Sequence, residues 1–409
     1  MDKEILAKYA RLVIEVGVNL QNDQLLVINA PLPCGEFARE LARAGWAAGA
    51  HDVIVNWSDE SLALLRYQKG RKSLFTEFPE WRVRFYQDYA EQGAAFVSIA
   101  ARNPELFAGV EPERLTLASQ AAGAALAEYR ARLMSNRNTW CVVSVPTEEW
   151  AGKVFPELPA AEARERLWQE ICHAVRVDSG DPVAAWREHI AFLQKACDFM
   201  NGQNFGSLHY KNSLGTDLTV ELPEGHIWAG GAEMCASGVE FAANLPTEEI
   251  YTLPRREGVN GIVYAAKPLI YNGNRIEGFH LTFREGRVIE YAAGTGEEIL
   301  KELLATDEGA RYLGEVALVP YDSPISRSGI LFYNTLFDEN AACHLALGKA
   351  YPTCLKGGEE MDSVTLLQHG ANDSLIHEDF MIGTQDLEIL GVTRDGRRVQ
   401  VFKDGNYAF

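Results

Sequence analysis

The chain has 409 residues, of which 47% are hydrophobic and 10% aromatic, so it can bury a large core, and its length predicts two domains. Its 57 acidic and 38 basic residues give a formal net charge of -19. This charge repels nucleic acid phosphates and anionic membrane surfaces, so we expect neither as a partner and favour cationic ligands instead.

Seven cysteines are scattered along the sequence without a CxxC pair. This pattern predicts neither a disulfide framework nor a thiolate zinc site, and it fits a reducing cytoplasm. The N-terminal segment forms a helical apolar stripe broken by charges, unlike the apolar core of a signal peptide. No run approaches the roughly 18 apolar residues that a membrane span needs. A cytoplasmic protein is therefore expected.

The first half of the chain alternates helical and strand patterns. An opening helix precedes a strand at 24–30, a helix at 35–50 and a strand at 51–57. This order favours a parallel sheet covered by helices. Asn201-Gly202 marks a helix stop, and we expect an α/β N-terminal domain over residues 1–203. Its other predicted elements are strands at 94–100 and 139–145 and helices at 111–134, 160–175 and 181–201.

The second half has a different pattern. Segments 209–222, 279–291 and 387–402 each consist of two apolar runs joined at a glycine-containing turn, which is typical of antiparallel hairpins. We therefore predict an α+β, strand-rich domain over residues 204–409 and assign the catalytic site to it.

Several common catalytic motifs are missing from the sequence. It has no GxGxxG after the first strand, no GxxxxGK[ST], no GxSxG and no HExxH. Nucleotide chemistry, a serine hydrolase and a single-zinc protease are accordingly disfavoured.

Carboxylates occur in otherwise apolar strand patterns. In segment 245–251, strand alternation places Glu249 on one face with Tyr251, and Glu248 on the other. Glu315 interrupts the apolar segment Gly314–Pro320. A buried carboxylate must be paired, protonated or given a cation, because an unpaired buried charge costs several kcal/mol. A salt bridge would satisfy Glu315 equally well, so the segment alone leaves both interpretations open.

A helix is predicted from Asp338 to Ala350, with Asp338 as N-cap and Pro352 ending it. On such a helix, His344 and Tyr351 return to nearly the same face after two turns. Glu339 would reach the same site only from the irregular first turn, and it is a weaker candidate.

A second histidine follows in the strand pattern of segment 375–380. His377 and Asp379 share one face there, which suits a single metal bound by both or two adjacent metals. A surface charge ladder is the alternative.

The charges of this set permit a dinuclear centre. Glu249, Glu315 and Asp379 neutralise three of the four positive charges of two divalent cations, His344 and His377 bind as neutral imidazoles, and a bridging hydroxide completes the balance. Ligands of this kind suit zinc, cobalt or manganese, and magnesium is a further candidate.

The strings NLPTEEIYTLP, LGEVALVP, FDENAACHLALGKAY and IHEDFMIG, in this order, resemble the aminopeptidase T and aminopeptidase S family of thermophilic metallopeptidases, the M29 group. The resemblance implies that Glu249 and Asp379 hold one metal, that His344 and His377 hold the other, and that Glu315 bridges them. Glu339 matches an acidic position beside the site, and Tyr351 matches the active-site tyrosine.

The resemblance also implies a cytoplasmic homodimer that releases N-terminal residues from short peptides with a free amine. In such a reaction the metals activate a bridging water, and Tyr351 donates a hydrogen bond to the oxyanion. The general base stays unassigned between Glu248 and Glu339. The N-terminal domain is expected to assemble the dimer or to control access. Two other functions remain open: another dinuclear amide hydrolase, such as a dipeptidase or deacylase, and a non-catalytic metal-dependent ligand-binding protein.

Overall fold

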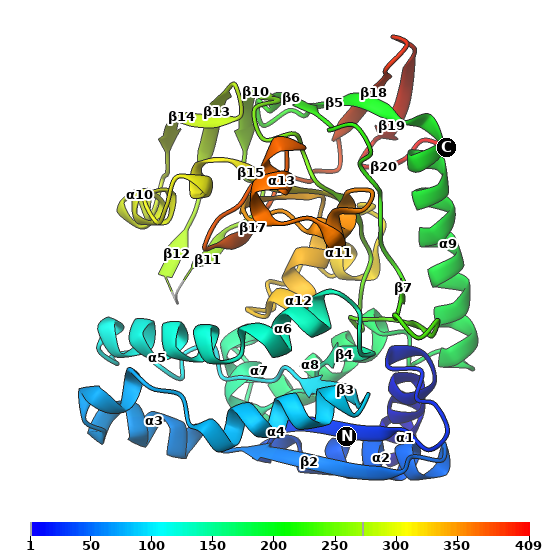
Figure 1. Cartoon of the computed structure of the whole chain (residues 1–409), viewed down its shortest axis with the longest axis vertical. Coiled ribbons are helices and arrows are strands. Elements are labelled where there is room, and N and C mark those ends of the chain that lie inside the picture. Colours follow the sequence, from blue (N-terminus) through cyan, green and yellow to red (C-terminus); the bar gives the residue numbers. More distant parts are fainter. Residues whose placement is uncertain (1, 272–273) are drawn as a thin grey trace. The chain divides into compact units, whose positions relative to one another are not determined.

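The computed structural model describes residues 2–271 and 274–409 (Figure 1). The chain forms two compact units. Unit 1 contains the chain up to His189 with Ala232–Pro246 and Phe332–Leu336, and unit 2 contains Ile190–Gly231, Thr247–Leu331 and Phe337–Phe409.

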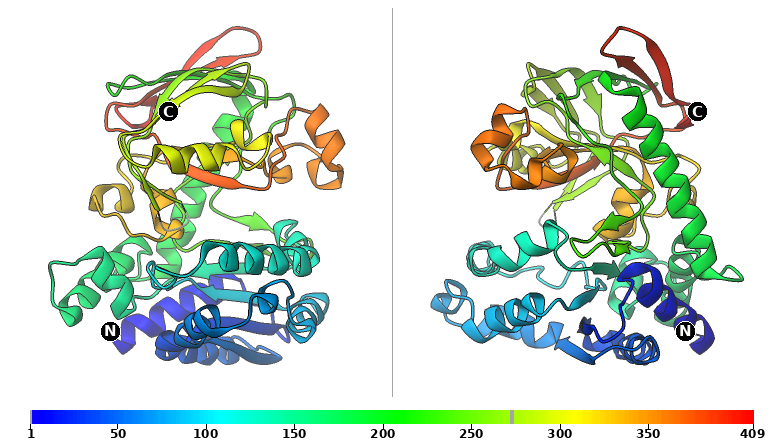
Figure 2. Two further views of the ribbon diagram at one scale, coloured as in Figure 1. Left: turned by 90° about the vertical axis from the view of Figure 1, so that its left-hand side faces the viewer. Right: turned by 45° about the vertical axis from the view of Figure 1, so that its right-hand side comes forward.

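Helix α9, Pro182–Gln203, contributes to both units and is drawn as one long helix in Figure 2. It ends at the predicted helix stop. Unit 2 nevertheless begins within this helix, at Ile190, whereas the sequence suggested a boundary at residue 203. The reason is packing, because Leu193 and Met200 of α9 belong to the apolar core of unit 2.

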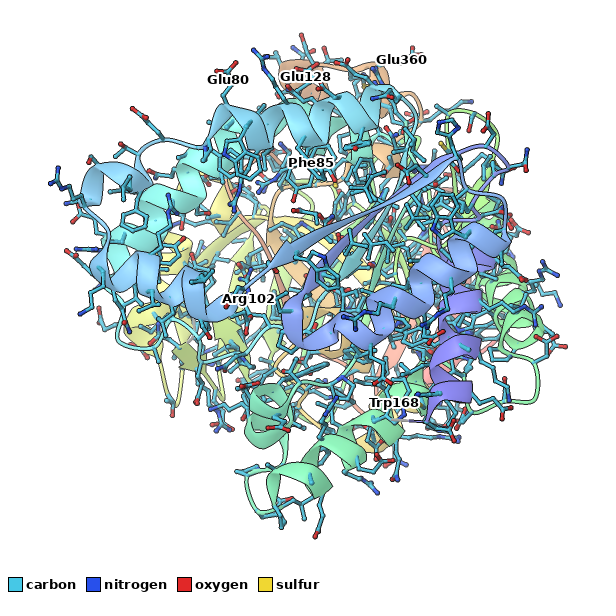
Figure 3. The ribbon with its side chains drawn as sticks, turned by 90° about the horizontal axis from the view of Figure 1, so that it is seen from below. Glu80, Phe85, Arg102, Glu128, Trp168 and Glu360 are labelled. Atoms are coloured by element: carbon cyan, nitrogen blue, oxygen red, sulfur yellow. The ribbon has the colours of Figure 1, made fainter. Side chains whose placement is uncertain are left out.

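Unit 1 is built on a four-stranded sheet in the order β2-β1-β3-β4, whose neighbouring strands all run parallel. Helices cover both faces. On one face, Val27 and Phe96 pack against Phe85 of α4, which Figure 3 labels, and on the other a Cβ added to Gly45 of α2 would meet Leu26 of β1. This arrangement confirms the predicted α/β fold with a parallel sheet.

The helices and strands of unit 1 are α1 (Lys3–Leu12), β1 (Leu25–Pro31), α2 (Gly35–Ala47), β2 (Asp52–Ser58), α3 (Glu60–Lys69), α4 (Glu80–Glu91), β3 (Ala95–Ile99), α5 (Pro112–Ala125), α6 (Ala127–Met134), β4 (Trp140–Val143), α7 (Glu148–Val154), α8 (Ala160–Ala174), β7 (Glu233–Met234) and β8 (Glu240–Phe241). The predicted segments are present within a few residues, although the helix predicted at 111–134 is divided into α5 and α6. The sequence patterns did not predict α3, α4, α7, β7 and β8.

Unit 2 contains an antiparallel eight-stranded sheet in the order β14-β13-β10-β6-β5-β18-β19-β20. The three predicted hairpins are its pairs β5–β6, β13–β14 and β18–β19, so the strand-rich α+β prediction is confirmed. Its strands and the helix that follows β14 are β5 (Phe205–Lys211), β6 (Asp217–Glu221), β10 (Val259–Tyr264), β13 (His280–Arg284), β14 (Arg287–Ala292), α10 (Glu297–Leu304), β18 (Glu388–Thr393), β19 (Arg398–Lys403) and β20 (Asn406–Tyr407).

A smaller antiparallel sheet has the order β17-β16-β15-β9. One of its faces presents Val316, Leu345 and Phe380 to a core shared with the larger sheet. Strand alternation turns the predicted ligands to the opposite face. Its strands and the other elements of unit 2 are β9 (Ile250–Thr252), β11 (Leu269–Tyr271), β12 (Asn274–Ile276), β15 (Leu313–Leu318), α11 (Pro324–Ser328), β16 (His344–Gly348), α13 (Ser363–Gln368) and β17 (His377–Met381). Helix α12 (Thr335–Asp338) begins in unit 1 and ends in unit 2.

The helix predicted over 338–350 is wrong. Helix α12 ends at Asp338, a 3-10 turn covers Glu339–Ala341, and His344–Gly348 is a strand. All five residues of this strand are buried, and β15 and β17 flank it on both sides. A short apolar run favours a helix by local propensity, but pairing on both edges fixes it as a central strand.

In the part of the chain that the structure describes, no helix is long and apolar enough to cross a membrane.

Candidate metal centre

The register of the smaller sheet brings the predicted ligands together. Glu315 lies opposite Ala346, which lies opposite Asp379, so an alanine separates the two acids in one row. In another row, Ala317 separates Tyr251 from His344. Because these two alanines fill little space, the longer side chains can converge above them.

Glu315 is the centre of the cluster. His344 Nε2 lies 3.5 Å from Glu315 Oε1, and His377 Nε2 lies 3.5 Å from Glu315 Oε2. His344 Nε2 is also 3.2 Å from Glu249 Oε2, and His377 Nε2 is 3.5 Å from Asp379 Oδ1. Each carboxylate oxygen of Glu315 therefore faces a different imidazole.

The donor atoms form two groups that share Glu315. Glu249, Glu315 and His344 make one group, and Glu315, His377 and Asp379 make the other; within each group the donor atoms lie within 4.8 Å of one another. Each group contains one histidine and one acid besides Glu315. This grouping differs from the expected pairing, which assigned both histidines to one metal.

The outer nitrogens of the two imidazoles face backbone carbonyls. His344 Nδ1 lies 3.1 Å from the oxygen of Ala342, and His377 Nδ1 lies 2.7 Å from that of Lys349. A carbonyl only accepts hydrogen bonds, so Nδ1 carries the proton and the Nε2 lone pair of each neutral ring faces the carboxylates.

This donor set fits divalent cations. Glu249 Oε2 and Asp379 Oδ1 are buried, and neither accepts a well-aligned hydrogen bond from the described residues. Nitrogen lone pairs and carboxylate oxygens that face each other inside a protein repel unless a proton or a metal lies between them. The mixture of imidazole and carboxylate is one that zinc, cobalt and manganese bind.

Without a metal, protons lie between the imidazole nitrogens and the carboxylate oxygens. Burial alone would lower the pKa of His377, but Asp379 and Glu315 outweigh it and raise that pKa to about 10. His344 behaves in the same way, because Glu249 and Glu315 raise its pKa well above the ordinary value despite burial. The site thus retains positive charge at its centre, which shows how strongly its carboxylates attract a cation.

Tyr351 reaches this cluster although the predicted helix is absent. Its ring centroid lies 4.8 Å from that of His377 and 5.9 Å from that of Tyr251. Burial and the surrounding carboxylates, Glu315 first among them, raise the pKa of Tyr351 well above the ordinary value. The phenol therefore stays protonated and can donate a hydrogen bond.

Glu339 lies beside the two donor groups and belongs to neither. It opens the 3-10 turn that follows α12, the irregular position from which the sequence allowed it to reach the site. Burial and repulsion from Glu249 and Asp379 raise the pKa of the Glu339 carboxyl well above the ordinary value. This acid is therefore a candidate for holding a proton.

Sequence reasoning missed two buried asparagines near the site. The Asn340 side chain accepts a hydrogen bond of 2.7 Å from the backbone N–H of Glu248. Asn372 donates to the carbonyl of Gly348, at the end of β16, over 2.6 Å, and accepts from Arg256 Nε over 3.0 Å. Only Asn340 has a hint in the sequence, since it follows the acidic pair Asp338-Glu339.

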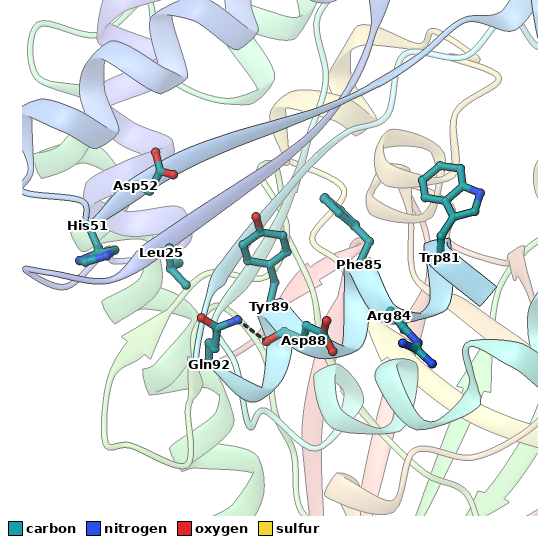
Figure 4. Close-up of a pocket in the computed structure, with 9 residues that line it drawn as sticks. All are labelled: Leu25, His51, Asp52, Trp81, Arg84, Phe85, Asp88, Tyr89 and Gln92. Carbon is teal, nitrogen blue, oxygen red and sulfur yellow. Dashed lines mark hydrogen bonds between the residues drawn. The ribbon is translucent and has the colours of Figure 1, made fainter. Parts of the chain in front are cut away.

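Unit 1 contains a hollow of about 620 Å³, shown in Figure 4. Trp81, Phe85 and Tyr89 line it from α4, opposite Leu25 and Asp52, the first residues of β1 and β2. None of the predicted site residues lines this hollow. Ligands of parallel α/β sheets bind at the carboxyl ends of the strands, and this hollow is at the amino ends.

Comparison with known proteins identifies the family of the chain. A model of the family "Thermophilic metalloprotease (M29)" matches residues 2–407. Aminopeptidase 2 of Geobacillus stearothermophilus and aminopeptidase AmpS of Bacillus subtilis (strain 168) are 50% and 48% identical over 404 residues, covering 99% of this chain and 98% of each relative. The solved structure of wild-type AmpT from Thermus thermophilus covers 100% of both chains, with 38% identity and a TM-score of 0.94. The chain therefore belongs to the M29 family of thermophilic metalloproteases.

Proposed function

We propose that this protein is an aminopeptidase that hydrolyses the first peptide bond of short peptides at a dinuclear metal centre. The observation that carries the proposal is the position of Glu315, which turns one oxygen toward each of two histidines and is shared by two donor groups. Family membership and the aminopeptidase names of the relatives support the reaction.

We assign the ligands by proximity. Glu249 and His344 would hold one cation, His377 and Asp379 the other, and Glu315 would bridge them. Two divalent cations held there would supply Lewis acidity and lower the pKa of a water molecule between them toward neutrality. The Nδ1 contacts to Ala342 and Lys349 keep both rings oriented with Nε2 toward the site.

Tyr351 is assigned the role of oxyanion donor. Its hydroxyl makes no hydrogen bond to any residue within 2–271 and 274–409, and its raised pKa keeps the proton on the oxygen. A neutral phenol at this position can donate to the negative charge that develops on the scissile carbonyl oxygen.

Glu339 is assigned the role of proton carrier, in place of a metal ligand. As a carboxylate, Glu339 would take up the proton that a water molecule loses on attack. Burial and the neighbouring acids raise its pKa, so the carboxyl would then hold this proton and release it to the departing amine. We therefore propose Glu339 as the general base, which sequence patterns left unassigned between Glu248 and Glu339.

The site can also recognise the free amine of the substrate. The amine of a peptide N-terminus would bind one of the cations or a carboxylate beside them. An N-blocked peptide lacks this group, so an aminopeptidase acting here needs the free amine.

We also propose that the protein is a homodimer and that it works in a reducing cytoplasm. In this proposal, unit 1 assembles the dimer or controls the access of substrates to the site. All seven cysteines are buried thiols without a disulfide, which supports a reducing compartment.

The proposal is tested by stripping the protein with a chelator and reconstituting it with zinc, cobalt, manganese or magnesium. Turnover of leucyl-p-nitroanilide should return with two metal ions per chain, counted by elemental analysis, and the N-acetylated substrate should stay intact. Full activity of the stripped protein, or equal cleavage of the blocked substrate, would contradict the proposal.

A further inference from the structure

Lys267 is a half-buried cation beside the ligand-bearing strands. The N–H of its neighbour Ala266 donates over 2.7 Å to the carbonyl of Met381, the last residue of β17. Lys267 Nζ itself lies 3.4 Å from the carbonyl oxygen of Ala341, which ends the turn that Glu339 begins. The backbone at residues 266–267 therefore lies beside the strand that carries Asp379, and the ammonium group contacts the turn that carries Glu339.

The hydrogen-bonding capacity of this ammonium group is largely unused. A lysine has three N–H donors, and Lys267 makes one long bond to a carbonyl. Within residues 2–271 and 274–409, no carboxylate lies within 4.0 Å of Nζ, and the acid that acts on it electrostatically is Asp338. Burial lowers the pKa of Lys267, and Asp338 only partly restores it. An anionic partner stabilises a partly buried ammonium group that has no carboxylate nearby.

A short peptide supplies such a partner. The C-terminal carboxylate of a short peptide is an anion, and productive binding benefits from a cation that pairs with it. We propose that Lys267 binds the C-terminal carboxylate of short peptide substrates and thereby favours peptides with a free C-terminus. This inference rests on the proposed aminopeptidase function and identifies a residue that determines specificity.

The test compares substrates with and without the carboxylate. Leucyl di-, tri- and tetrapeptides are assayed as free acids and as C-terminal amides, together with leucyl-p-nitroanilide, on reconstituted enzyme. The variants are Lys267→Met and Lys267→Arg, with Lys301→Met as a matched control, because Lys301 is an exposed lysine paired with Glu298 over 3.0 Å.

We expect the loss of Lys267 to affect only the substrates that have a free C-terminal carboxylate. The Lys267→Met variant should lose about tenfold in kcat/KM on the free acid whose length best reaches the lysine, mainly through KM. The amides and the anilide should change less than about twofold. Lys267→Arg should keep part of the preference, since it keeps the charge, and Lys301→Met should behave as the wild type.

Two results would overturn the inference while leaving the aminopeptidase function intact. One is a wild-type enzyme that cleaves acids and amides equally well at every length. The other is an equal loss on acids, amides and the anilide in Lys267→Met, which would show that the lysine only supports the Ala341 turn. Absence of all leucyl hydrolysis by metal-loaded wild type would instead reject the aminopeptidase function, and the inference with it.

Discussion

Asn340 holds Glu248 in place through a hydrogen bond of 2.7 Å from the Glu248 backbone N–H to the asparagine Oδ1. Asn340 is fully buried, and Glu248 is only 3% exposed. The bond connects the segment that carries Glu249 to the turn that carries Glu339. A side chain without direct contact to substrate can thus set the distance between a metal ligand and the candidate proton carrier.

We therefore expect Asn340→Ala to lower both stability and activity. Removing the acceptor leaves a buried N–H unpaired, which costs about 2 kcal/mol. Denaturant unfolding measures that cost, and metal stoichiometry reports the displaced ligand. Asn260→Ala is a matched control, because its Oδ1 accepts the same kind of bond from the N–H of Glu285 over 2.9 Å at an exposed position. If Asn340→Ala matched that control in both measurements, the positioning role would be rejected.

Glu315→Gln should remove metal and activity together. An amide has one oxygen and no charge, so it cannot turn an anionic oxygen toward each histidine. We expect fewer than two metal ions per chain and a loss in kcat of at least about 100-fold. Glu378→Gln, next to Asp379 on the same strand, is the control because alternation turns Glu378 to the other face. Retention of two ions by Glu315→Gln would disprove the bridging role.

Tyr351→Phe should slow the chemical step without releasing metal. Loss of one oxyanion donor typically lowers kcat by about 100-fold, and KM should change little because the bond forms in the transition state. Steady-state kinetics on leucyl-p-nitroanilide and elemental analysis of the same sample measure both effects. Tyr264→Phe, on β10 of the larger sheet, provides the comparison. An unchanged kcat with both ions bound would exclude the proposed role of Tyr351.

Metal removal should make stability depend on pH. In the stripped protein the folded-state pKa of His377 is raised to about 10, above the unfolded value of about 6.5. The stabilisation from its protonated form is therefore complete below about pH 6.5 and is lost as pH rises toward 10. We expect Tm of the stripped protein to fall between pH 6.5 and 9.5, and that of the metal-loaded protein to fall less. Parallel Tm profiles would contradict this account.

Sequence patterns selected residues that the structure brings together, but they did not predict all of the local structure around these residues. Glu315 was identifiable because one carboxylate in an apolar strand needs a partner, and the strand Leu313–Leu318 is buried throughout. His377 and Asp379 were placed on one face by strand alternation, and β17 has that register. His344 and Tyr351 were also selected, but through a helix that does not exist. Apolar periodicity over five residues cannot distinguish a helix from a buried strand.

Composition, alternation and hairpin turns were enough to predict the fold class of both halves and the acidic character that favours cations. Which donor atoms lie together depends on the tertiary structure. Glu315, Ala346 and Asp379 come from three strands, and their meeting depends on a register set by non-local hydrogen bonds. The same is true of the grouping of each histidine with its own acid, of the hydrogen bond of Asn340 and of the position of Lys267. Each of these contacts joins segments that are far apart in the chain, and a local sequence pattern carries no information about such contacts.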